Sequence, residues 1–542
     1  MKPGHAGTIS YGPFVTRRAA SLGIAATVVA LSAALSGPAE AQKRGGALHQ
    51  IINPEPPILV VGIATNTPVQ TVGGKIFSGL ITYGFDLKPM PNLAESFDIS
   101  PDGKAYTFRL HKNAKWHDGK PLTSEDVVFS FTKILPEVNP RARLNFARAE
   151  SVTAPDPHTV VVTLKEPFAP FIMAFDVATA PILPKHVYDG TDYRANPANS
   201  VPIGSGPFKF KEWKRGGHIH LVRNDDYYKP GKPYLDEMFF HIIPDAGQRV
   251  VALETQRVHV AAFSDIEWFE VQRLKKLPFL ELTTKGYEMF APVSWLDMNH
   301  SRKPFNDVRF RKAMMHAHDR TFMRDNIFNG LGRVANGPIN SVTQFYDEAA
   351  LVKYPYDLKT AEALLEDMGL KKGAGGVRAK IEMIVMPYGE VWQRVAEYSR
   401  QQLRRIGVEV TLKNTDVAGF NQASSNFDYD TTWQYLFQFG DPAIGVARSY
   451  ISSNIKKGVM FTNTHQYSNP KVDEAFSQGA AALARGERQK WYTEMQKITT
   501  DEVAVGWMHE LEFPTFYNKK FKGIVTTALG VNESYDEVFL AE

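Results

Sequence analysis

Strand-like and helix-like patterns alternate along almost the entire chain. Apolar and polar residues alternate at 105–110 and 218–223, as expected of half-buried strands. Apolar residues recur at helical spacing at 358–368 and 391–406. This mixture predicts α/β lobes built on sheets. Because 542 residues exceed what one hydrophobic core holds, we expect at least two lobes.

Local signals also predict individual boundaries. Residues 54–68 are rich in Pro and Thr and predict a loop, after which a short helix is expected at 74–80. Thr-Ser-Glu-Asp at 123–126 predicts the cap of a helix, because Ser and Thr oxygens accept from free amide groups there. One helix is expected over 307–328, where apolar residues keep helical spacing.

The first 41 residues have the layout of a secretory signal peptide. Basic residues precede an apolar stretch at 19–35, and Ala39-Glu40-Ala41 supplies the small residues that a signal peptidase requires. The strongly apolar part is shorter than the roughly 20 residues that span a bilayer, so cleavage after Ala41 is predicted rather than a retained anchor. Thr16-Arg17-Arg18 leaves twin-arginine export open beside the general secretory route. The predicted destination is the periplasm.

Composition excludes several kinds of chemistry. The chain has no cysteine, which rules out disulfides, thiolate nucleophiles and cysteine-based metal sites. Its 62 basic and 58 acidic residues are interleaved, so nucleic acid is not an expected partner. No nucleophile elbow, phosphate loop or dinucleotide fingerprint occurs, and we assign no catalytic residue. His218-x-His220 and His316-x-His318 lack the spacing of a zinc site, so no metal ligand and no cofactor is assigned.

Groups of turn and cap residues follow one another in a particular order. They are Trp116-His117-Asp118-Gly119-Lys120-Pro121, Gly204-Ser205-Gly206-Pro207-Phe208, Arg223-Asn224-Asp225-Asp226-Tyr227-Tyr228, Lys232-Pro233-Tyr234-Leu235-Asp236, Pro304-Phe305-Asn306-Asp307-Val308-Arg309 and Ser468-Asn469-Pro470-Lys471-Val472-Asp473. In this combination the chain resembles the family 5 bacterial extracellular solute-binding proteins of ABC importers, the dipeptide-, oligopeptide- and nickel-binding type. The resemblance runs from about Gly45 to beyond Phe521.

The resemblance implies an α/β, two-lobed periplasmic-binding-protein fold of type II, in the large three-domain variety with a hinged interlobe cleft. After the signal peptide at 1–41, the implied domains are a discontinuous lobe-one domain (42–85, 200–285 and 513–542), an inserted lobe-one domain (86–199) and lobe two (286–512). The implied function is that of a monomer, not an enzyme, that closes on a small-molecule solute. It would deliver that solute unchanged to the permease and ATPase of an ABC importer.

The expected solute is a short peptide or another amino-acid-derived compound, such as an opine-like conjugate. Three alternatives remain open: a binder of chelated metal or haem, a periplasmic hydrolase on the same scaffold, and a ligand-presenting partner of a chemoreceptor. The aromatic-rich segment at 431–453 and a loop of the opposing lobe are the candidate ligand-binding regions. The candidate contacts are Trp433, Tyr435, Gln438, Asp441, Arg448, Asn66 and Thr67.

In peptide-binding relatives, a loop ending near Gly-Asp-Pro supplies an aspartate for the α-amino group of the ligand. Here Gly440-Asp441-Pro442 is present, and counting back without gaps puts Gln438 in that place. A neutral amide loses the charge-assisted bond to an ammonium. Either Gln438 or, with a gap, Asp441 takes the role. Alternatively, Trp433 and Tyr435 pack in the core of a buried strand, Arg448 forms a surface or interlobe salt bridge, and Asp441 caps the following turn.

Overall fold

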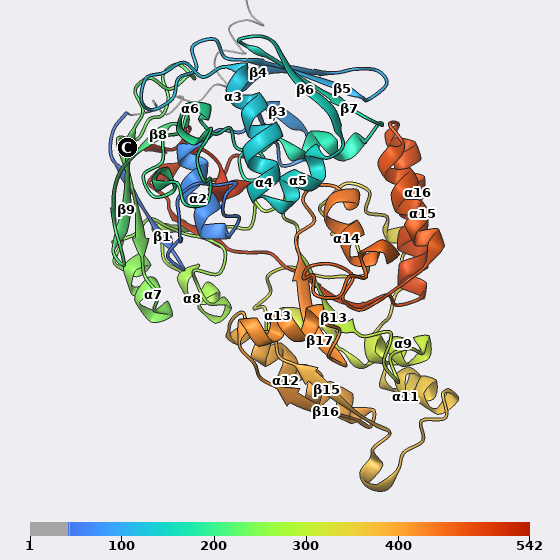
Figure 1. The fold of residues 1–542 in the computed structure, drawn as a ribbon. Helices are drawn as coiled ribbons and strands as arrows, with labels where there is room; N and C mark the ends of the chain where they lie inside the picture. The colour runs from blue at the N-terminus through green and yellow to red at the C-terminus, as the bar shows by residue number, and fades with distance from the viewer. Residues whose placement is uncertain (1–41, 43, 542) are drawn as a thin grey trace, which may run out of the picture.

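The computed structural model describes residues 42 and 44–541, so the predicted signal peptide lies outside the described residues. The described chain forms two lobes (Figure 1). The blue, cyan and green elements and the C-terminus form lobe one, whereas the yellow and orange strands form lobe two. No helix in the described part of the chain is long and apolar enough to cross a membrane.

Lobe one contains a seven-stranded sheet whose strands come from distant parts of the sequence. In sheet order these are β12 (Leu280–Thr283), β19 (Thr515–Asn518), β11 (Val260–Ala261), β1 (Ala47–Ile52), β10 (Glu237–Ile242), β9 (His218–Arg223) and β8 (Phe208–Lys214). The central strand β1 runs parallel to both of its neighbours, β10 and β11. The loops that follow these three strands therefore meet at one edge of the sheet.

Two further sheets complete the main framework. An antiparallel sheet in lobe one has the order β4 (Ala94–Ile99), β5 (Ala105–Leu110), β7 (Thr159–Leu164), β6 (Ala149–Asp156). Lobe two is built on a mixed sheet in the order β14 (Arg333–Val334), β18 (Gly506–Glu510), β13 (Val293–Met298), β17 (Thr431–Leu436), β15 (Ala379–Ile384), β16 (Val408–Lys413). Two small strand pairs are β2 (Ile81–Tyr83) with β3 (Pro89–Pro91) and β20 (Phe521–Lys522) with β21 (Phe539–Leu540).

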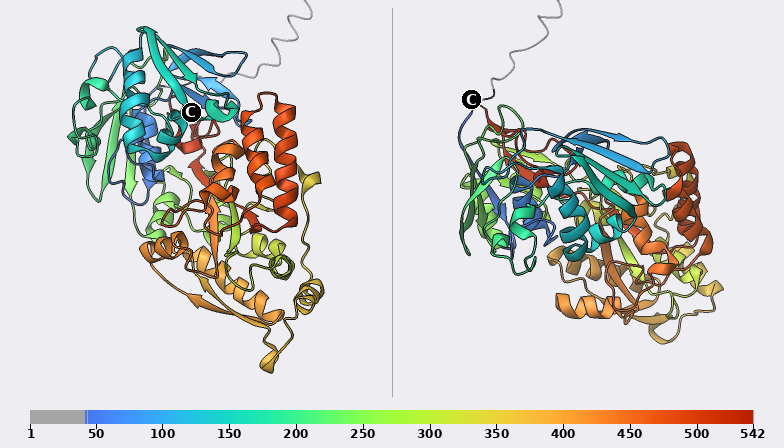
Figure 2. Two further views of the ribbon diagram at one scale, coloured as in Figure 1. Left: turned by 45° about the vertical axis from the view of Figure 1, so that its right-hand side comes forward. Right: turned by 45° about the horizontal axis from the view of Figure 1, so that its top comes forward.

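Helices cover these sheets. In lobe one they are α2 (Thr67–Ile76), α3 (Ser124–Phe129), α4 (Leu135–Val138), α5 (Pro140–Phe146), α6 (Lys185–Tyr188), α7 (Ala246–Glu254) and α8 (Val271–Leu274). In lobe two they are α9 (Val308–Ala317), α10 (Arg320–Asn326), α11 (Leu358–Asp367), α12 (Glu390–Arg405), α13 (Val417–Ser425), α14 (Ala447–Tyr450), α15 (Pro470–Ala481) and α16 (Arg485–Asp501). The helices α15 and α16 stand beside the inserted strands of lobe one (Figure 2).

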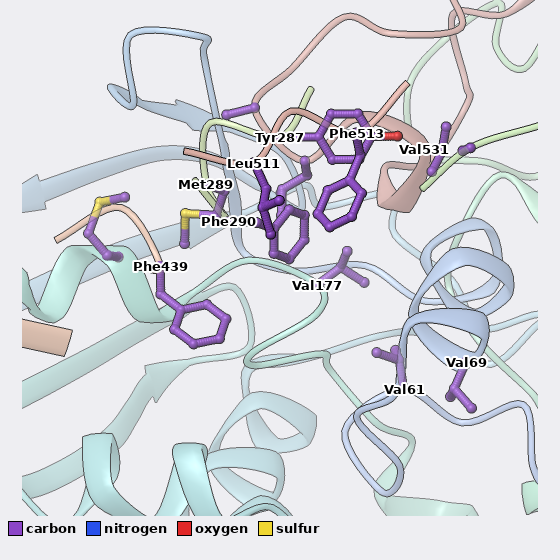
Figure 3. Close-up of a cluster of buried hydrophobic side chains, with 14 of the residues drawn as sticks. Val61, Val69, Val177, Tyr287, Met289, Phe290, Phe439, Leu511, Phe513 and Val531 are labelled. Carbon is purple, nitrogen blue, oxygen red and sulfur yellow. The ribbon is translucent and has the colours of Figure 1, made fainter. Parts of the chain in front are cut away.

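The chain crosses between the lobes at two segments. It leaves the seven-stranded sheet after β12, passes through 284–292 into β13, and returns from β18 to β19 through 511–514. Tyr287, Phe290, Leu511 and Phe513 from these segments stand together in one buried group (Figure 3). These crossovers are the candidate hinge of the expected closure. The domain boundaries given above stay a prediction.

Two local predictions are wrong. The helix expected at 74–80 is α2, which begins at Thr67, because the Asn66 side chain accepts a hydrogen bond from the Val69 amide (3.2 Å) and Pro68 suits a first turn. The single helix expected over 307–328 is divided into α9 and α10. The Asp319 carboxylate accepts from the Phe322 amide (2.9 Å) and starts the second helix.

Candidate functional site

Two adjoining cavities lie between the lobes. The first, which we call the aromatic chamber, has a volume of about 460 Å³. The second, which we call the strand-end chamber, has a volume of about 570 Å³. Both chambers are lined by Asn66, Thr67, Phe263, Tyr388, Tyr435 and Phe437. Since these residues come from both lobes, the chambers form one interlobe cleft of the size that small-molecule ligands occupy.

Rings dominate the lining of the aromatic chamber. They belong to Phe263, Phe290, Tyr388, Tyr435, Phe437, Phe439 and Phe461. The ring centres of Phe290 and Phe437 are 5.3 Å apart, and those of Phe437 and Phe439 are 6.1 Å apart. Figure 3 shows Phe439 projecting from its loop, apart from the group that contains Phe290. This surface suits the apolar body of a ligand.

Two arginines from opposite lobes face the aromatic chamber. Arg141 lies on α5 of lobe one and Arg448 lies on α14 of lobe two. The two guanidinium carbons lie 3.8 Å and 5.4 Å from the ring centre of Phe439. Arg141 donates to the Thr179 hydroxyl (3.2 Å), and Arg448 donates to the backbone carbonyls of Gly445 (3.1 Å) and Phe437 (2.9 Å).

The charge of these arginines is not balanced inside the chamber. Among the described residues that line it there is no Asp or Glu. Burial, with repulsion from Arg141 as the second cause, lowers the pKa of Arg448 to about 9. Burial lowers the pKa of Arg141 too, although Asp176 attracts that guanidinium. The aromatic chamber is therefore a cationic, ring-lined space.

The strand-end chamber lies where the parallel strands of lobe one end. Its lining includes Asn53 to Glu55 after β1, Arg249 after β10, and Ala262 to Asp265 after β11. In open α/β sheets this edge is the usual place for a ligand, because loops diverge there on either side of a central strand. Tyr388 and Tyr435 of lobe two close the chamber from the other side.

The structure brings four of the sequence-predicted residues to the cleft. Asn66 and Thr67 line both chambers from the start of α2, and the Asn66 side chain caps that helix. Tyr435 lines both chambers and stacks on Trp392 with ring centres 5.5 Å apart. Arg448 lines the aromatic chamber and forms no salt bridge with a described residue, so its predicted alternative as a salt-bridge partner is not seen.

The other three predicted residues line neither chamber. Trp433 is 1% exposed and its indole nitrogen lies 3.3 Å from the Ser399 hydroxyl, as the core-packing alternative requires. The Gln438 amide accepts from the Asn340 backbone amide (3.0 Å) and donates to the Pro338 carbonyl (2.8 Å).

Asp441 is likewise turned away from the cleft. Its carboxylate caps the turn after it by accepting from the Ala443 amide (3.0 Å), and it pairs with Arg488. The structure therefore offers neither Gln438 nor Asp441 to a ligand amine.

The sequence singled out the segment that contains Phe439 without naming this ring as a contact, and it gave no sign of Arg141 or Asp265. Phe439 lies within the aromatic-rich segment that the sequence singles out, so its neighbours were a usable signal. Arg141 sits on a different lobe, close to Arg143, whose guanidinium instead binds the carbonyls of Pro136 and Glu137. No local pattern distinguishes these two arginines. Within residues 42 and 44–541, no group of three or more His, Asp or Glu residues could hold a metal ion.

A larger cavity, of about 700 Å³, lies elsewhere between the inserted strands and α15. Its lining is mainly small or charged residues, including Arg148, Lys165, Glu166 and Asp473. It contains none of the sequence-predicted residues. We place the candidate site in the interlobe cleft, because rings and two buried guanidinium groups converge there without a carboxylate in the lining of the aromatic chamber.

Comparison with known proteins defines the class. The sequence profile of the bacterial extracellular solute-binding proteins, family 5 (middle), matches residues 88–457, and the chain belongs to this family. The family resemblance and the two-lobed α/β periplasmic-binding-protein fold expected from the sequence are thereby confirmed. The members are non-catalytic solute-binding proteins of ABC importers, so the prediction that the chain is not an enzyme is also confirmed.

Individual relatives agree with this assignment. The chain is 29% identical over 467 residues to the oligopeptide-binding protein AppA of Bacillus subtilis, covering 83% of each chain. It resembles the structure of AgaA from A. tumefaciens R10 in complex with agropinic acid, with 28% identity and a TM-score of 0.76. The match covers 92% of this chain and 99% of AgaA. For the substrate-binding protein CtaP of Listeria monocytogenes the identity is 24%, the TM-score 0.81, and the coverage 92% and 100%.

Proposed function

We propose that this protein is the periplasmic receptor of an ABC importer for an amino-acid-derived anion. The carboxylate of this solute binds in the aromatic chamber, between Arg141 and Arg448. After closure of the lobes, the loaded receptor docks on its permease and releases the solute unchanged. The observation that carries the proposal is the pair of arginines facing a chamber whose described lining has no carboxylate.

An anion would satisfy both guanidinium groups at once. Each is a rigid fork of donors that matches a carboxylate, and each lacks an anionic partner in the cleft. Their mutual repulsion contributes to the lowered pKa of Arg448, and a bound anion would remove that cost. Because the two arginines come from different lobes, an anion between them would also favour the closed form.

A solute held by its α-amino group at the Gly-Asp-Pro loop is less well supported. Gln438 and Asp441 are both occupied by partners within the protein. The rings of Phe263, Phe290 and Phe437 instead provide an apolar surface beside the arginines. The similar protein AgaA forms a complex with agropinic acid, an acidic ligand, which supports a carboxylate-bearing solute for this chain as well.

The test begins with native mass spectrometry of protein purified from its host, which identifies a co-purified solute. Calorimetric titration then compares each carboxylate ligand with its amide or ester. We expect the neutral derivative to bind roughly 10- to 100-fold more weakly, the usual effect of losing a charge-assisted hydrogen bond. Equal affinity of acid and amide would contradict the proposal.

Variants of the arginines provide the second half of the test. Arg448→Met should weaken carboxylate binding by a similar factor without lowering the thermal stability of the empty protein, because it removes a charge that Arg141 repels. Arg141→Met should weaken binding by a similar factor but also lower the stability, because buried Asp176 loses the guanidinium that attracts it. Arg400→Met is the matched control. Arg400 is half exposed on α12 and pairs with Glu397, so its loss should leave affinity unchanged.

A further inference from the structure

We propose that the strand-end chamber binds a positively charged end of the solute, an ammonium or guanidinium group, through the carboxylate of Asp265. This inference rests on the proposed function, since it places the second end of the same solute. The two chambers adjoin through the residues that they share. One elongated molecule can therefore occupy both.

Asp265 is a buried carboxylate with unused acceptor capacity. It lies in the loop after β11, is 8% exposed, and lines the strand-end chamber. Its Oδ2 atom accepts a hydrogen bond from the Ala262 amide (2.9 Å). Its Oδ1 atom accepts none from the described residues, although an ionised carboxylate offers about four acceptor positions. Oδ1 is not completely buried, unlike the unpaired side-chain oxygen of Gln50, so a donor from a ligand or from water can reach it in the chamber.

The nearest buried cation does not supply that donor. Arg249, on α7, is 4% exposed and also lines the chamber. Its hydrogen bonds go to backbone carbonyls, those of Asp265 (2.5 Å), Ile243 (3.2 Å) and Pro244 (2.5 Å). Arg249 therefore holds the loop in place and does not contact the Asp265 carboxylate. Burial outweighs its attraction and raises the pKa of Asp265 to about 7.

One further polar atom of the chamber lacks a partner, and two more carboxyl groups line it. Gln50, on β1, is 1% exposed, and its side-chain oxygen is buried without a hydrogen bond. Glu267 lines the chamber from the same loop region as Asp265. Glu55 lines it too, but this carboxylate accepts from the Trp213 indole (3.0 Å) and the Gly216 amide (3.2 Å) and lies 3.9 Å from Arg215, so its charge is partly compensated. Three carboxyl groups and one guanidinium thus line this chamber, in contrast to the two guanidinium groups of the aromatic chamber.

The cleft is therefore polarised along its length. A solute with a carboxylate at one end and a cationic group at the other would place each charge against its opposite. Such a molecule satisfies Asp265 at the strand-end chamber and both arginines at the aromatic chamber. The inference is thus a zwitterionic solute with a defined orientation.

The test uses cationic probes that carry no carboxylate, agmatine and putrescine, so that it does not depend on the arginines. Calorimetric titration at millimolar concentration should show binding to the wild-type protein and to Arg448→Met. Asp265→Asn should bind the probes at least tenfold more weakly. The asparagine oxygen can still accept from the Ala262 amide, so the variant should fold, which a thermal melt checks.

Asp245→Asn is the matched control. Asp245 is exposed and caps α7, and asparagine caps equally well, so probe affinity should not change. A second control needs only the wild-type protein. 1,4-Butanediol has the length of putrescine but no charge, so it should not bind. Absence of probe binding, equal binding of the diol, or unchanged affinity in Asp265→Asn would each overturn the inference.

The two proposals fail in different ways. If binding of the solute requires its carboxylate but Asp265→Asn does not change the affinity for agmatine and putrescine, only the proposed cationic subsite is wrong. If the amines need Asp265 but the acid and its amide bind equally, only the anionic end is wrong.

Discussion

The Nη2 atom of Arg488 lies 2.9 Å from Oδ1 and 2.8 Å from Oδ2 of Asp441, and both side chains are buried. Arg488 also donates to the Gly479 carbonyl (2.7 Å), so it joins the loop after β17 to α15 and α16. Asp441 was a candidate for the ligand amine. In this structure its carboxylate is instead paired with Arg488 inside lobe two.

The first prediction concerns this ion pair. Asp441→Asn should lower the free energy of unfolding in urea by about 3–5 kcal/mol, because it leaves the Arg488 charge buried without its partner. The asparagine can still accept from the Ala443 amide, so the turn is kept. Affinity for the solute should be unchanged. An apolar pair, Asp441→Leu with Arg488→Met, should recover much of the lost stability, whereas a loss of affinity alone would contradict this assignment.

The second prediction separates two neighbouring rings of β17. Trp433→Ala should reduce the unfolding free energy by about 3–5 kcal/mol, as expected for a large side chain removed from a core. Tyr435→Ala should instead weaken solute binding roughly tenfold, with a smaller loss of stability, because Tyr435 lines both chambers. Urea denaturation and calorimetry on both variants provide the comparison. The opposite assignment of effects would show that Trp433 faces the solute.

The third prediction concerns Gln438. Gln438→Asp places a carboxylate against the Pro338 carbonyl and removes the donor that this carbonyl uses, so stability should fall by about 1–3 kcal/mol. The variant should gain no affinity for a dipeptide with a free amino group, because the side chain does not reach the cleft. A thermal melt and a dipeptide titration measure the two effects. Tighter dipeptide binding would refute the placement.

The fourth prediction follows from stacked rings on the seven-stranded sheet. The ring centres of His220 and Phe239 lie 4.1 Å apart, those of Phe239 and His49 4.9 Å, and those of His49 and His241 5.1 Å. The His259 ring meets His49 edge-on at 5.2 Å. Burial lowers the pKa of His241 from 6.5 to about 4 and that of His259 to about 3.

At a pH between 6.5 and the lowered pKa values of His241 and His259, the unfolded chain binds more protons than the folded one. The folded protein is therefore most stable above about pH 6.5, where both histidines are neutral in the folded and in the unfolded chain. Its free energy of unfolding decreases as the pH falls toward 4, the pKa of folded His241, and toward 3, the pKa of folded His259. Urea midpoints of the wild-type protein and of His241→Gln across this range test the effect. The variant should lose less stability on acidification, and parallel curves would contradict the assignment.

Sequence patterns predicted the regular elements well where local chemistry decides them. The expected strands at 105–110 and 218–223 are β5 and β9, because alternation along the chain directly reports a half-buried sheet face. The start of α2 escaped prediction, since Pro and Thr are as common in loops as at a capped helix start. Gly74 lies inside α2, although glycine usually disfavours a helix. A larger residue cannot replace it, because an added Cβ would meet the Asn532 carbonyl oxygen at 2.0 Å, a contact that only the fold reveals.

Local sequence also predicted part of the candidate site. The segment that contains Tyr435 and Arg448 stands out by its density of rings, and it does line the cleft. Arg141 and Asp265 contribute through tertiary placement, each on a different part of lobe one. Trp433 shows the converse limit. Trp433 and Tyr435 lie two residues apart on β17 and therefore point to the same face of the sheet, where both meet Trp392. Only Tyr435 reaches the cleft, and this difference depends on the position along the strand, which alternation in the sequence does not report.

The placement of β19 has a consequence for how the molecule is made. Strands β11 and β12 both pair with β19, one on each side, and β19 ends at Asn518 near the end of the chain. A nascent polypeptide must therefore extend past residue 518 before the seven-stranded sheet can form, and until then the edges of β11 and β12 that pair with β19 stay open to chaperones or to aggregation. Closure of the seven-stranded sheet is therefore a late step of folding.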